Sequence, residues 1–192
     1  SMASGGDMSR SGVQVEYVSV GSVSSVWPAS GAVSGGTMVT LVGSGFVAGR
    51  TACKFGAGMA VEAVVASSSE AVCVAPAGAR VSVSVEVATS FDGQVISAGE
   101  LSTSSKVFAY ESSVSVASVT PSAASVEGGN VLSVVANGLE DGVSAWCKLG
   151  SVVVASGKSS SGIVECASVA GVAGNMTVEV SSNGQDFSAS SG

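Results

Sequence analysis

Two stretches, "VSSVWPASGAVSGGTMVTLVGSGF" at residues 23–46 and "VASVTPSAASVEGGNVLSVVANGL" at residues 116–139, decide how the chain is organised. They align without a gap at a shift of 93 residues, the difference between 116 and 23. At this shift Pro28 falls on Pro121. Because such self-similarity at a fixed spacing is the mark of an internal repeat, we predict two copies of one structural unit.

The match continues beyond these stretches. "CKFG" at 53–56 lies over "CKLG" at 147–150 at a shift of 94, and "SVEV" at 84–87 lies over "TVEV" at 177–180 at 93. In "VSVSVEV" at 81–87 the valines alternate with polar residues, as in a half-buried strand. Short strands separated by Gly and Pro turn signals predict an all-β chain made of two β-sandwiches.

Composition excludes several classes of function. The 192 residues carry a net charge of −7 and no His, and their few basic residues are scattered. Nucleic-acid binding needs a dense positive surface, and His is the commonest general base and metal ligand, so we expect no nucleic-acid partner and no enzyme. We assign no catalytic, cofactor-binding or metal-binding residue, and no apolar run is long enough for direct membrane insertion.

The combined pattern resembles a known family. "VxxVxPxxG", "GGTxVTLxGxGF", "CKFG", "VCVAP" and "VEV" followed by "FDGQ" are similar to the motifs of IPT/TIG domains, the immunoglobulin-like modules of plexins and of Rel-type transcription factors. The second copy departs from this pattern at Ala124 and Leu139. The resemblance implies two tandem immunoglobulin-like sandwiches of the E-set type, from a larger multi-repeat protein.

Domain boundaries follow from the repeat and the resemblance. We expect the second domain to lack its last strand, because "VFAYE", which closes the first copy, has no counterpart after "NGQDF". The expected segments are a cloning remnant or disordered stretch at 1–12, the closing strand of a preceding domain or a linker at 13–21, the first domain at 22–111 and the second at 114–192.

These boundaries lead to a hypothesis about partners. A sheet that lacks its last strand has an unpaired edge, and unpaired edges recruit strands. We therefore expect head-to-tail self-association in which "VQVEY" at 13–17 of one molecule fills the edge in another. The other expected partners are neighbouring IPT/TIG domains of the parent chain, and the short bridge "YESSVSV" at 110–116 should restrict bending between the two domains.

The four cysteines fall at corresponding positions, two in each copy, and could pair in three ways. The repeat favours Cys53 with Cys73 and Cys147 with Cys166, because each unit should be closed within itself, and IPT/TIG domains of receptors are similar in this respect. Disulfides indicate an oxidising compartment. Four buried free thiols in a cytosolic protein are the alternative.

Two acidic tips, "FDGQ" at 91–94 and "NGQDF" at 183–187, follow similar strands. The acids nearest to them are Glu86, Asp92, Glu179 and Asp186. A Ca²⁺ site would need several converging oxygens, whereas Asp-Gly and Asn-Gly are ordinary hairpin turns because they accept positive φ. We interpret both tips as turns.

Three further residues are candidates for function. Trp27 and Trp146 could each be an exposed recognition anchor, with Trp27 beside Pro28 the better candidate, although such a Trp more often packs at a domain junction or beside a disulfide. Asn175-Met176-Thr177 is an acceptor sequence for N-glycosylation.

We expect a non-catalytic structural or recognition segment of a large cell-surface or secreted protein, which mediates protein–protein contact, adhesion or spacing. One alternative is a carbohydrate-binding or accessory module of an extracellular enzyme. The other is an intracellular Rel-type module.

Overall fold

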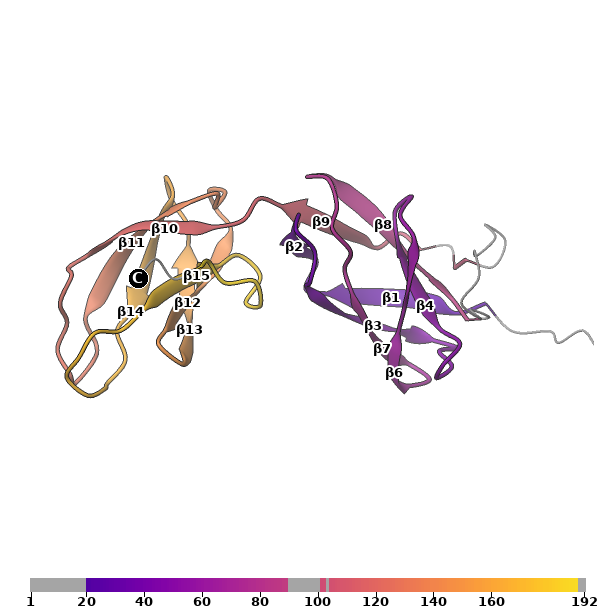
Figure 1. The fold of residues 1–192 in the computed structure, drawn as a ribbon, viewed down its shortest axis with the longest axis horizontal. Helices are drawn as coiled ribbons and strands as arrows, with labels where there is room; N and C mark the ends of the chain where they lie inside the picture. Colours follow the sequence, from indigo (N-terminus) through magenta and orange to yellow (C-terminus); the bar gives the residue numbers. More distant parts are fainter. Residues whose placement is uncertain (1–19, 90–100, 103, 190–192) are drawn as a thin grey trace, which may run out of the picture.

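The computed structural model describes residues 20–89, 101–102 and 104–189, which form two β-sandwiches joined end to end (Figure 1). All the helical or strand structure in these residues is strand, so the prediction of an all-β chain with two tandem sandwiches is confirmed. No helix among them is long and apolar enough to cross a bilayer.

The first domain contains two sheets that pack face to face. One has four strands, in the spatial order β1 (Ser22–Trp27), β3 (Met38–Ser44), β7 (Glu70–Val74) and β6 (Val64–Ser67). The other has five strands, in the order β2 (Ser30–Ala32), β9 (Val107–Glu111), β8 (Ser82–Ala88), β4 (Ala52–Phe55) and β5 (Ala60–Glu62). All of the pairs are antiparallel except β2 with β9, which are parallel.

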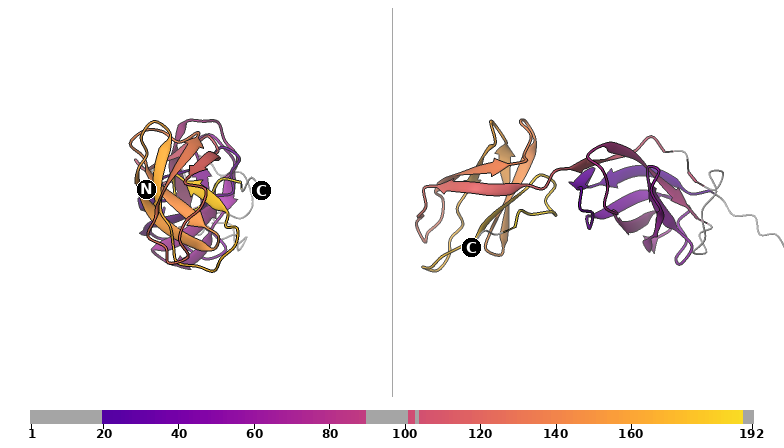
Figure 2. Two further views of the ribbon diagram at one scale, coloured as in Figure 1. Left: turned by 90° about the vertical axis from the view of Figure 1, so that its left-hand side faces the viewer. Right: turned by 45° about the horizontal axis from the view of Figure 1, so that its top comes forward.

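The second domain repeats this plan with fewer strands. One sheet has the order β10 (Ser115–Thr120), β11 (Val131–Asn137) and β14 (Ile163–Ala167). The other has the order β13 (Val152–Lys158), β12 (Ser144–Leu149) and β15 (Val178–Ser181). Figure 2 shows the two sandwiches in other orientations, with the bridge between β9 and β10 joining them.

The repeat is visible in the strand register as well as in the sequence. The β1–β3 pair has a bulge between Val23 and Ser25, and the β10–β11 pair has one between Val116 and Ser118, which are the same positions at the shift of 93. The Gly-Gly turns also agree: Gly35 has φ of 74° and its counterpart Gly128 has 75°. Positive φ strongly favours glycine, which explains why both copies keep it there.

The core of each domain lies between its two sheets and is made of alternate strand residues. In the first domain Val39, Leu41, Val85 and Val87 are completely buried, and three aromatic rings, Phe55, Phe108 and Tyr110, pack edge to face. The second core has no aromatic ring among its buried residues and is built from Leu132, Val134, Leu149, Val164 and Val180.

A disulfide connects the two sheets of each sandwich. Cys53 on β4 is bonded to Cys73 on β7, and Cys147 on β12 is bonded to Cys166 on β14. All four cysteines are at most 1% exposed, so the disulfides lie inside the cores.

The two domains differ in how the second sheet ends. In the first domain β8 has β4 on one side and β9 on the other. In the second, β15 pairs with β12 alone among the strands of the described residues. Ser188 bonds to both backbone groups of Val180 on the other edge, so that edge lacks a strand partner only at Val178 and the residues before it. Residues 13–17, the segment predicted to fill such an edge, lie outside the described residues.

Candidate functional site

The tip "SSNGQD" at 181–186 forms a compact loop directly after β15. The Asn183 side-chain oxygen accepts hydrogen bonds from the backbone N–H groups of Gln185 (2.9 Å) and Asp186 (2.8 Å). Gly184 has φ of 77°, the left-handed conformation that Asn-Gly turns use. The loop is therefore held by its own side chains. Its counterpart "FDGQ", which contains Asp92, lies outside the described residues.

This loop is also the main polar contact between the two domains. One oxygen of Asp186 (Oδ2) accepts hydrogen bonds from the hydroxyl of Thr37 (2.6 Å) and from the backbone N–H of Ala32 (3.2 Å), both in the first domain. The Asn183 side-chain NH₂ donates to the backbone carbonyl of Ser30 (2.9 Å) and to Asp186 (2.8 Å). The loop of one sandwich is thus bonded to β2 of the other and to the turn that follows it.

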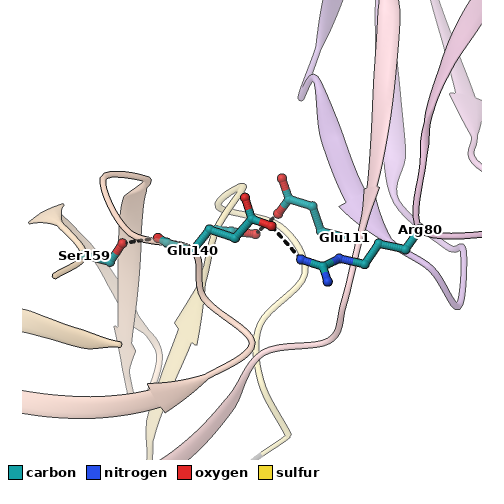
Figure 3. Close-up of polar contacts among 5 residues, drawn as sticks. Arg80, Glu111, Glu140 and Ser159 are labelled. Atoms are coloured by element: carbon teal, nitrogen blue, oxygen red, sulfur yellow. Dashed lines mark hydrogen bonds and ion pairs between the residues drawn. The ribbon is translucent and has the colours of Figure 1, made fainter. Parts of the chain in front are cut away.

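Two further contacts cross the junction on its outer side (Figure 3). The Ser182 hydroxyl donates to the Glu111 carboxylate over 2.9 Å, at the last residue of β9. Arg80 forms an ion pair with Glu140 over 2.5 Å, and the backbone carbonyl of Glu140 accepts a hydrogen bond from Ser159. The Arg80 and Glu140 side chains are 59% and 67% exposed, so solvent screens this pair and its contribution is small.

We call this set of contacts the junction: Ser30, Ala32, Thr37, Arg80 and Glu111 of the first domain with Glu140, Ser182, Asn183 and Asp186 of the second. Thr37 is 1% exposed and Asn183 is 4% exposed, so the centre of the junction is shielded from water. A hydrogen bond in such a place loses little to competition with solvent. The arrangement can hold two sandwiches in one relative orientation.

The other acids near the tips take part in neither the junction nor a metal site. Glu86 lies opposite Lys54 in the β4–β8 pair, and Glu179 forms an ion pair with Lys148 over 3.0 Å. Among the described residues there is no group of three or more Cys, Asp or Glu side chains that could hold a metal ion.

The two tryptophans have different surroundings. Trp146 is half-buried beneath the junction loop, where a Cβ added to Gly184 would lie 3.3 Å from its ring. Trp27 is 60% exposed at the end of β1, so its side chain is free for contact with another molecule. Its role as a recognition residue stays a prediction.

Trp27 belongs to an apolar outer face on the first domain. It lies opposite Thr40, which lies opposite Val72, which lies opposite Val64, so these four side chains form a row across the sheet. Val64 is 75% exposed, and Met38 and Val74 in the adjacent row are 57% and 52% exposed.

The corresponding row in the second domain is polar. Thr120 lies opposite Ser133, which lies opposite Glu165. The two domains therefore present different outer faces to their surroundings.

Asn175 is exposed in the loop that precedes β15, a position that a glycan could occupy without displacing core residues. Its glycosylation stays a prediction.

The junction role of Asp186 and Asn183 was not evident from the sequence. The sequence identifies the tip at 183–187 as a turn, but no feature of that sequence indicates that the Asp186 carboxylate would face a neighbouring domain. The one available signal was its difference from "FDGQ": the two tips follow equivalent strands yet place their acid and amide groups at different positions.

Comparison with known proteins agrees with this architecture. The IPT/TIG domain family matches residues 22–105 and 115–192. Two structures of the full extracellular region of plexin A4, one with domains 1 to 8 and one with domains 1 to 10, are similar to the chain with TM-scores of 0.51 and 0.55. Each is 18% identical over 85% of this chain, which spans 17% and 14% of the respective plexin chains. No curated protein sequence matches it. The chain therefore belongs to the IPT/TIG domain family, of which it carries two copies in tandem.

Proposed function

We propose that the chain is a non-catalytic segment of a large cell-surface or secreted protein, in which it holds two immunoglobulin-like sandwiches at a fixed angle and offers their faces for protein contact. Such a segment can mediate adhesion, or it can set the spacing of neighbouring domains.

The observation that carries this proposal is the docking of the 181–186 loop against the first domain. Asp186 and Asn183 bond to three residues there, and only residues 112–114 separate β9 from β10. A short linker with a bonded interface limits relative motion of two domains, whereas a bare linker allows it.

An extracellular location is supported by the disulfides. Both are buried cross-links inside a sandwich, and such bonds persist in oxidising compartments. An intracellular Rel-type module has no comparable support. A carbohydrate-binding surface is built from exposed aromatic rings, and Trp27 is the one strongly exposed ring among the described residues, so protein contact is the better proposal.

Spin labels on cysteines introduced at Val64 and Val153 test the fixed angle. These residues are exposed on β6 of the first domain and β13 of the second, and the four native cysteines are all in disulfides. A single narrow distance distribution is expected, comparable in width to that of a control pair within the first domain at Val64 and Met59. A broad or multi-peaked distribution for the cross-domain pair alone would overturn the proposal.

A further inference from the structure

In the first domain β9 fills a gap between β2 and β8. It pairs in parallel with β2 and antiparallel with β8. Its alternate residues Phe108 and Tyr110 are 0% and 5% exposed, and the Phe108 ring packs edge-on against Phe55 with centroids 5.5 Å apart. The strand therefore closes the core as well as the sheet.

The second domain has an open groove at the corresponding place. It has a volume of about 820 Å³ and is lined by residues that include Val119, Ala124, Leu149, Val169, Gly171 and Val178. Two of its boundaries are the start of β15 with the residues before it, at 175–178, and the segment 123–125, which corresponds to β2 but forms no strand.

Backbone hydrogen bonds establish that the two places correspond. Gly78 donates to the carbonyl of Val33 over 2.9 Å, and Gly171 donates to Val126 over the same distance, each partner shifted by 93. Gly56 donates to Ser84, and Gly150 likewise donates to Thr177. Leu149 therefore occupies the position of Phe55, so the groove lies where Phe108 and Tyr110 lie in the first domain.

The groove keeps the features that receive a tyrosine. In the first domain the Tyr110 ring lies on Gly78, where an added Cβ would be 2.7 Å from the ring, and its hydroxyl donates to the carbonyl of Pro76 over 2.8 Å. The counterparts of Gly78 and Pro76 are Gly171 and Val169. An added Cβ at Gly171 would meet only the end of the Met176 side chain, at 3.5 Å, so the place of the ring is vacant.

The same shift identifies a segment of the chain that would fit. Subtracting 93 from Phe108 and Tyr110 gives Val15 and Tyr17, which stand alternately in "VQVEY" at 13–17. The smaller valine suits this groove. A Cβ on Gly31 would lie 2.2 Å from the Thr37 hydroxyl and 2.7 Å from the Phe108 ring, and the counterpart of Gly31 is Ala124, whose methyl group takes up that space.

We propose that this groove is an acceptor site for a β-strand, and that its occupant is the segment 13–17 of a second copy of the chain, with Val15 and Tyr17 facing inward. The inference rests on the proposed role in protein contact and gives it a specific partner. The strand would pair antiparallel with the residues leading into β15, with Gln14 opposite Thr177 as Val107 is opposite Ser84. Strand addition to an open edge gains main-chain hydrogen bonds, and side-chain pockets supply the specificity.

The segment cannot reach the groove of its own molecule. The described chain enters the first domain through β1, which starts at the end of that domain that faces away from the second (Figure 1). Only residues 18 and 19 separate Tyr17 from Val20, the first described residue, and two or three extended residues span only about 10 Å.

A contact between two copies would repeat a geometry that the chain already contains. Within one molecule, three residues separate β9 from β10, and the second domain follows the first. In the proposed contact the equivalent residues would connect the donated strand to β1, so that the first domain of one copy follows the second domain of another. Such a head-to-tail contact does not close on itself as a twofold dimer does, and it extends into chains.

Sedimentation velocity of the full chain, from low to high micromolar concentration, tests the proposal. Wild-type protein is expected to form growing oligomers. V15D should weaken this association at least about tenfold, because a carboxylate is costly to bury in an apolar groove. Q14D, which adds the same charge at an outward-facing position, is the matched control and should associate like wild type.

Two variants used together separate donor from acceptor. G171V should fill the place of the tyrosine ring on the acceptor side, and it leaves residues 13–17 intact. V15D and G171V should each be monomeric alone, whereas their mixture should form a one-to-one dimer and nothing longer, since one supplies the groove and the other the strand. Wild-type protein that stays monomeric, association that survives either variant, or a mixture that fails to dimerise would each overturn the proposal. The angle within one chain is measured on monomer, so it can be fixed even if this contact fails.

Discussion

Removing the Asp186 carboxylate is the sharpest perturbation of the junction. D186A deletes two cross-domain hydrogen bonds, to Thr37 (2.6 Å) and Ala32 (3.2 Å). A hydrogen bond to a charged acceptor contributes about 1.5–3 kcal/mol. Because the Asp186 side chain is half-buried, we take the low end of about 1.5 kcal/mol for the bond to Thr37 and about 0.5 kcal/mol for the long bond to Ala32, which gives a total loss of about 2 kcal/mol of docking free energy.

A loss of that size lowers the ratio of docked to undocked molecules about 30-fold. The contacts that remain are weak: the bond of Asn183 to Ser30 is worth about 1 kcal/mol, and the bond of Ser182 to the half-exposed Glu111 carboxylate about 1.5 kcal/mol or less because solvent screens it. We therefore expect the distance distribution between labels at positions 64 and 153 to broaden in D186A, and to broaden further on warming.

The matched control is E140Q, which removes the exposed ion pair with Arg80 at the same junction. It should change docking by less than about 1 kcal/mol and leave the distribution narrow. A distribution in D186A as narrow as that of wild type, with the second domain still folded, would refute the role assigned to the loop.

Three further variants test the cores. Replacing Cys147 and Cys166 by serine opens a 19-residue loop and should lower the unfolding free energy of the second domain by about 3 kcal/mol in urea, with the transition of the first domain unchanged; two unshifted transitions would contradict this. Y110F loses the hydrogen bond to Pro76 and should cost the first domain about 1 kcal/mol. Burial raises the pKa of Tyr110 above its usual 10.0. The contribution of the protonated phenol to the unfolding free energy is therefore complete below about pH 10 and is lost as pH rises further. Urea titrations should show that raising the pH above about 10 lowers the unfolding free energy of wild type more than that of Y110F. G31A places a methyl group 2.2 Å from the Thr37 hydroxyl and 2.7 Å from the Phe108 ring, and should cost the first domain about 1–3 kcal/mol by thermal unfolding, whereas A124G should not stabilise the second domain comparably.

Much of the fold could be predicted because its determinants are local. Alternating valines require strands with one buried face, and the Gly-Gly turns need positive φ at positions such as Gly35 and Gly128. These features recur at a constant shift, so one copy helped to interpret the other.

The junction could not be predicted because it depends on how two units meet. The turn chemistry of Asn183 and Gly184 is local, but the partners of Asp186 lie 149 and 154 residues away, at Thr37 and Ala32. A hydrogen bond over such a separation is set by the angle between the domains, which no short pattern encodes. An edge without a partner strand could be expected in the second domain, but the lining of the groove beside it could not, since it comes from several separate segments.

Residual dipolar couplings of V15D, the variant expected to be monomeric and to leave the junction intact, test the fixed angle most directly. Backbone N–H couplings from each domain define an alignment tensor for that domain independently of the other. If the 181–186 loop holds the sandwiches as described, both sets will give one tensor with the same magnitude and with axes that coincide when the domains are placed as in Figure 1. Two tensors of different magnitude, or axes that match only after rotation of one domain, would contradict the central claim.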